Sequence, residues 1–112
     1  MKKLLLIVNG ETALEYDRET TLDEDKLAFL DSMDKDMDKG IKIYGELINQ
    51  PDAEQRARFI TLNLIKALQQ DNHAIIQVSC AYLATRMPAL NEVQVSDGEG
   101  KIDIVLVEDV VN

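Results

Sequence analysis

The sequence has 112 residues, 46% of them hydrophobic, and a formal net charge of −9. This length predicts a single domain spanning 1–112 with a modest core, and the apolar content is that of a globular protein. The negative charge argues against nucleic acid and against an anionic membrane surface, because both bind basic patches. A single cysteine, Cys80, excludes an internal disulfide and fits a reducing compartment. No stretch approaches the roughly 20 apolar residues of a membrane span.

The opening residues MKKLLLIVNGE carry two lysines, as a signal peptide would, but their apolar run is only Leu4 to Val8. We therefore expect a cytoplasmic protein of bacterial style. Residues 1–40 contain eleven acids against six bases, and residues 89–112 contain six acids against one base. Such acidic ends would steer a basic partner toward the protein.

Residues 3–17 predict a hairpin, because Asn9-Gly10 is the pair that a two-residue hairpin turn prefers. The first strand is apolar throughout, which is typical of a central strand. A helix is predicted over 21–40, with Thr21 and Glu24 as a capping box and Gly40 at its end.

Residues 41–50 are expected to be extended or irregular. A second helix is predicted over 53–70, capped by Asp52 with Gln55. A third, over 72–87, is stopped by Pro88 and is apolar almost all round, which predicts burial on two sides. The residues from 92 to 109 alternate as a second hairpin around a turn at 97–100.

The predicted order is therefore β-β-α-α-α-β-β, which is an α+β domain. Its four-stranded, mainly antiparallel sheet would consist of the two terminal hairpins, with three helices packed on one face. The apolar first and last strands are expected to be the central pair.

The most unusual stretch is DSMDKDMDKG, residues 31–40. A calcium loop beginning at Asp34 would find glycine at its sixth position and glutamate at its twelfth, but Lys39 and Gly45 occupy them. We predict no metal site there, and read the stretch as helix. On a helix, Asp31, Asp34 and Asp38 fall within about 60° of one another. This acidic stripe is either a solvated edge or a recognition surface for a basic partner.

Four other polar residues are candidates for a ligand pocket: Arg56, Arg58, His73 and Tyr82. The two arginines would pair with the acidic helix or bind an anionic ligand. One histidine and one cysteine cannot form a zinc site, which takes three or four such ligands. We interpret His73 as structural and Cys80 as a packed thiol. No phosphate loop, nucleophile elbow or dinucleotide fingerprint is present, which counts against an enzyme, and no cofactor is predicted.

The second helix also carries apolar residues away from its main stripe, namely Phe59, Leu62 and Ile65. Either the first helix or another protein would have to cover them.

These observations favour a protein–protein interaction module, an adaptor, accessory or regulatory factor that binds another protein or itself as a homodimer. Phe59, Leu62 and Ile65 would supply affinity, and the acidic stripe would supply orientation. Two alternatives stay open. One is a small enzyme or ligand-binding protein with a pocket between sheet and helices, using Asp34 with the four polar residues above. The other is a homo-oligomeric structural protein.

Overall fold

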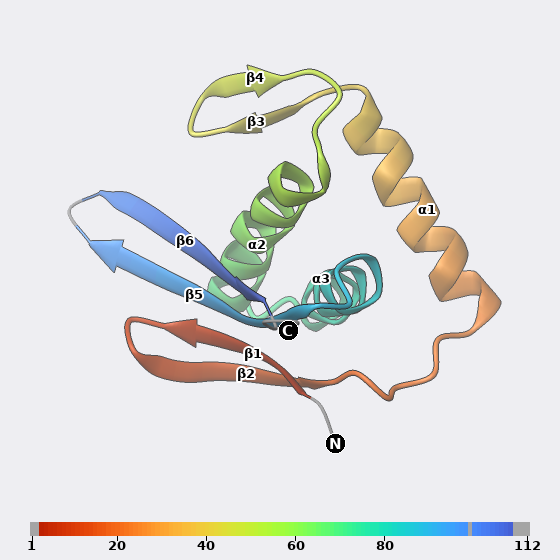
Figure 1. The fold of residues 1–112 in the computed structure, drawn as a ribbon, viewed down its shortest axis with the longest axis horizontal. Helices are drawn as coiled ribbons and strands as arrows, with labels where there is room; N and C mark the ends of the chain where they lie inside the picture. The colour runs from red at the N-terminus through yellow and green to blue at the C-terminus, as the bar shows by residue number, and fades with distance from the viewer. Residues whose placement is uncertain (1–2, 99, 109–112) are drawn as a thin grey trace.

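The computed structural model describes residues 3–98 and 100–108, and Figure 1 shows their arrangement. Two hairpins at the ends of the chain flank a helical middle. The elements in chain order are β1 (Lys3–Val8), β2 (Glu11–Asp17), α1 (Glu24–Asp38), β3 (Ile41–Ile43), β4 (Glu46–Ile48), α2 (Ala53–Gln69), α3 (His73–Arg86), β5 (Leu90–Gly98) and β6 (Lys101–Glu108).

The main sheet has the strand order β2-β1-β5-β6. Strand β1 is antiparallel to β2 and parallel to β5, and β5 is antiparallel to β6. The sheet is thus mixed, with two antiparallel pairings and one parallel pairing. The α+β class, the four-stranded sheet of two terminal hairpins, and the three helices on one of its faces are confirmed.

The prediction that the last strand is central was wrong, because β6 lies at an edge and β5 takes the inner position beside β1. Parallel pairing of Leu5 with Glu92 and of Val8 with Val95 produces this order. An apolar composition had suggested burial of β6 on both faces, yet Val105 on that strand is 53% exposed.

A second, two-stranded sheet lies between α1 and α2, where residues 41–50 had been expected to be extended or irregular. Its turn is made by Tyr44 and Gly45, with φ values of 52° and 78°. Both residues of a type I′ hairpin turn need positive φ. Tyrosine rarely adopts that conformation, so the sequence gives little sign of this hairpin.

The helix boundaries follow the capping residues. The predicted box of Asp52 and Gln55 at the start of α2 is present, with both side chains bonded to the opposite backbone N–H. Helix α1 is instead capped by Asp23, which accepts from the Lys26 N–H at 2.8 Å, so it starts later than Thr21. Asn72 caps α3.

The core lies between the helices and the face of the sheet that they cover. Its largest fully buried side chains include Leu30, Leu64, Leu83, Leu90, Val93 and Val95. Burial of α3 on two sides is confirmed, since Ile76, Cys80, Ala81, Tyr82 and Leu83 are all buried. No helix within residues 3–98 and 100–108 is long and apolar enough to cross a membrane.

Candidate functional site

The acidic side chains of α1 face arginines of α2 and α3. Asp34 is at the centre, because Arg56 Nη1 donates to its Oδ1 at 3.0 Å and Arg86 Nε donates to its Oδ2 at 3.1 Å. The Tyr82 hydroxyl also donates to Asp34 Oδ1. One carboxylate therefore accepts hydrogen bonds from side chains of two other helices.

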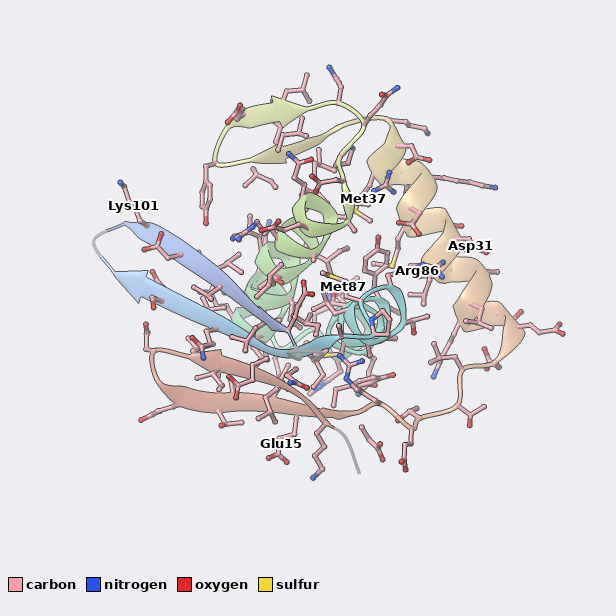
Figure 2. The ribbon with its side chains drawn as sticks, in the orientation of Figure 1. Glu15, Asp31, Met37, Arg86, Met87 and Lys101 are labelled. Atoms are coloured by element: carbon pink, nitrogen blue, oxygen red, sulfur yellow. The ribbon has the colours of Figure 1, made fainter. Side chains whose placement is uncertain are left out.

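Each flanking aspartate of the stripe joins one of the same arginines. Arg86 Nη2 donates to Asp31 Oδ1 at 2.6 Å, and Arg56 Nη2 donates to Asp38 Oδ1. Figure 2 shows Asp31 and Arg86 pointing toward each other across the gap between α1 and α3. We call Asp31, Asp34, Asp38, Arg56, Tyr82 and Arg86 the Asp34 cluster. It ties α1 to the α2–α3 pair.

The electrostatics of the Asp34 cluster follow from these contacts. Burial would raise the pKa of Asp34, but the hydrogen bonds from Tyr82, Arg56 and Arg86 outweigh it and hold the pKa below its ordinary value. Burial, followed by the hydrogen bond to Asp34, raises the pKa of Tyr82. A carboxylate with a lowered pKa is a weak base, and a phenol with a raised pKa stays protonated. Asp34 is therefore ionised and Tyr82 protonated near neutral pH, and the cluster joins the three helices through charged hydrogen bonds.

A cleft of about 280 Å³ opens beside the cluster and is lined by Asp34, Ala53, Arg56, Tyr82, Arg86 and Met87. It brings together three of the residues considered for a ligand pocket, namely Asp34, Arg56 and Tyr82. Arg58 lies elsewhere and donates to the Ile104 carbonyl at 2.6 Å and to Glu54 at 3.0 Å. His73 is exposed at the start of α3, with Asp71 at 3.3 Å.

The apolar residues singled out on α2 lie mostly against the core. Ile65 is buried, and Phe59 and Leu62 are partly buried and pack on the core cluster. The fold itself therefore covers most of this surface. Large apolar side chains that stay exposed are found instead at Leu27, Phe29, Tyr44, Leu47, Ile75 and Val105.

Phe29 and Ile75 border a groove of about 320 Å³ between α1, α2 and α3. Met33, Ile60 and Ala67 also line it, with polar side chains that include Asn63 and Lys66. A groove of this volume has room for no more than a few apolar side chains.

Further apolar side chains lie on the face of the main sheet opposite the helices, which we call the open face. Register places two rows of side chains there: Leu5, Glu92 and Val107 in one, and Ile7, Gln94 and Val105 in the other. Leu5, Ile7 and Val107 are partly exposed, and Val105 is exposed. Strand β1 is thus apolar on both faces, although the helices cover one of them.

The two edges of the sheet are blocked in different ways. On β6, the Tyr44 hydroxyl donates to the Ile102 carbonyl and Arg58 donates to the Ile104 carbonyl, so side chains occupy backbone groups that a new strand would use. On β2, Ala13 is an extra residue between the Leu6–Leu14 and Ile7–Thr12 pairs. Such a bulge disrupts edge-to-edge pairing.

Two arginines that organise the fold are not among the residues predicted from the sequence. Arg86 bonds to Asp31 and Asp34, more than 50 positions earlier in the chain. Arg18, just after β2, donates to the Ala84 carbonyl at 3.1 Å, to the Met87 carbonyl at 3.4 Å and to the Leu90 carbonyl. These carbonyls lie at and beyond the end of α3, where a cation is favoured. No local pattern of the sequence signals either role.

The chain matches no protein-family model, and no curated protein or solved structure is similar to it in the comparisons.

Proposed function

We propose that this protein is a cytoplasmic protein–protein interaction module, an adaptor, accessory or regulatory factor, which binds its partner through the open face of the main sheet. The observation that carries the proposal is a group of incompletely buried apolar side chains on that face: Val105 is 53% exposed, and Leu5, Ile7 and Val107 are partly exposed. Leu5 and Ile7 belong to a strand whose composition is typical of burial on both sides. A partner covering them would complete that burial.

The blocked edges support docking on the face rather than strand addition. A peptide that extends a sheet needs a row of unoccupied backbone groups. The bonds from Tyr44 and Arg58 to β6, and the bulge at Ala13 in β2, reduce what either edge offers.

The Asp34 cluster gives less support to the acidic stripe as the main recognition surface. Its three carboxylates already bind Arg56 and Arg86 within the fold. A basic partner would have to compete with these internal ion pairs. The stripe would then add orientation through its exposed members, Asp31 and Asp38, while the open face supplies affinity.

The experiment is affinity capture from native extract with wild type and two matched variants, Val105→Asp and Leu47→Asp. Both positions are exposed aliphatic residues, 53% and 59% exposed, and Leu47 lies on β4, outside the main sheet. We expect one set of proteins to be retained by wild type and by Leu47→Asp and lost with Val105→Asp. Equal retention by the two variants, or no retained protein, would contradict the proposal.

A second function, ligand binding, is favoured by the cleft of about 280 Å³ that gathers Asp34, Arg56, Tyr82 and Arg86. Both arginines are paired with carboxylates of α1, so an anionic ligand would bind there in competition with these ion pairs. Its test is a thermal-shift screen of anionic metabolites against wild type and Arg86→Gln. A compound that raises the melting temperature of wild type alone would support this function.

A further inference from the structure

We infer that the partner of the open face carries an arginine or lysine that binds Glu92, and that Glu92 selects this partner over a second copy of the chain. The inference rests on the proposed function, because it names the chemistry that the same surface would recognise.

Glu92 lies between two of the apolar residues of the open face. On β5 it is paired with Leu5 of β1 on one side and with Val107 of β6 on the other. Its side chain is partly exposed, and the Gln94 amide donates to its Oε2 at 3.0 Å. No cation among the described residues forms an ion pair with it, in contrast to Glu15 on the same face, which has Lys3 at 3.4 Å.

This placement sets a requirement for any partner that covers the valine and leucine side chains around Glu92. Covering them removes water from the carboxylate as well. A carboxylate that loses water without gaining a charged donor is strongly unfavourable. The Gln94 amide satisfies part of its hydrogen-bonding capacity, and a guanidinium or ammonium group of the partner would satisfy the rest.

The charges of the whole face argue against a second copy as the occupant. Register places four acids on it, Asp17, Glu15, Glu92 and Asp103, against two lysines, Lys3 and Lys101. Two copies packed through this face would bring two such acidic surfaces together, each belonging to a chain of net charge −9. A partner with an apolar face and a central basic residue is complementary on both counts.

The test uses designed β-hairpin peptides closed by a disulfide, which display four valines around one central position. That position holds arginine, its neutral isostere citrulline, or glutamate. Binding to the whole protein is measured by fluorescence anisotropy for wild type, Glu92→Gln and Val105→Asp. Unchanged circular dichroism and urea unfolding must first show that both variants fold.

We expect the arginine hairpin to bind wild type at least about tenfold more tightly than the citrulline hairpin, as for a close charge pair in a protein interface. This preference should fall below about twofold in Glu92→Gln, because the carboxylate is then gone. Sedimentation of wild type alone should show a monomer.

The outcomes separate the inference from the proposed function. Equal binding of the arginine and citrulline hairpins, with loss of both in Val105→Asp, would overturn the inference and leave the open face as a docking surface. Binding unaffected by Val105→Asp, or no binding of any hairpin at millimolar concentration, would overturn both. Dimerisation of wild type that Val105→Asp abolishes would show that a second copy is the occupant, and would also overturn the inference.

Discussion

Replacing Asp34 with asparagine removes the central charge of the Asp34 cluster while keeping the shape of the side chain. Asparagine keeps one oxygen, which can still accept from Tyr82 and Arg56. Its NH₂ group, however, would face Arg86 Nε, so a 3.1 Å hydrogen bond becomes a contact between two donors.

The magnitude follows from how much of the cluster is buried. The side chains of Arg56, Asp34 and Arg86 are 17%, 29% and 32% exposed, between a surface pair and a buried one. A fully exposed pair contributes up to about 1 kcal/mol, and breaking a buried pair costs about 3–5 kcal/mol. For Asp34→Asn we expect a loss of about 2–3 kcal/mol in the free energy of unfolding.

The assay is urea unfolding followed by circular dichroism. With a slope of about 1–3 kcal/mol per molar urea, a loss of this size lowers the unfolding midpoint by about 0.7–3 M. The matched control is Asp36→Asn on the same helix, because the Asp36 side chain is exposed and lies outside the Asp34 cluster. Its free energy of unfolding should stay within about 0.5 kcal/mol of the wild-type value. Equal midpoints for the two variants would show that the charge of Asp34 does not stabilise the fold.

The stability difference between wild type and Asp34→Asn should depend on pH and decrease in acid. The folded protein holds the pKa of Asp34 below the ordinary value of about 3.9. The ionised carboxylate therefore contributes its full stabilisation of the folded state above that value. It is lost as pH falls through the lower folded pKa. The stability difference between wild type and Asp34→Asn should therefore be constant from pH 5 to 7 and shrink below about pH 4. A difference that persists undiminished well below pH 4 would show that the charge of Asp34 is not what stabilises the cluster.

Two further predictions concern residues outside the Asp34 cluster. Arg18→Met keeps the aliphatic stem and removes the donors to three carbonyls at and beyond the end of α3. The free energy of unfolding in urea should therefore fall by about 1–3 kcal/mol. An unchanged unfolding midpoint would contradict this role of Arg18. Burial raises the pKa of the Cys80 thiol to about 11, so iodoacetamide at pH 8 should leave the native protein unlabelled and label it in urea. Labelling of native protein as fast as of the unfolded chain would contradict the buried position.

The parts of the fold that follow local rules could be predicted from the sequence. The Asn9-Gly10 turn and the capping box of Asp52 and Gln55 act within a few residues, and both are present as expected. The alternating pattern of the last two strands also gave their hairpin, although Glu99 in its turn lies outside the described residues. Element type and order therefore came from the sequence with few errors.

The parts that failed depend on contacts between distant segments. Either β5 or β6 could pair with β1 on grounds of composition, and only the packed molecule selects β5. The acidic stripe was recognised as a group, but its pairing with Arg86 spans more than 50 residues. The open face was missed for the same reason, since it requires knowing which side of β1 the helices cover.

A partner that binds the open face of the sheet would lie against residue 105. The most direct measurement places a photoreactive benzophenone amino acid at position 105 or, in a control protein, at position 47, and irradiates the cells that produce them. We expect a discrete heavier product from position 105, absent from position 47 and abolished by Ile7→Asp on the same face. Crosslinking that is equal at the two positions, or that survives Ile7→Asp, would contradict it.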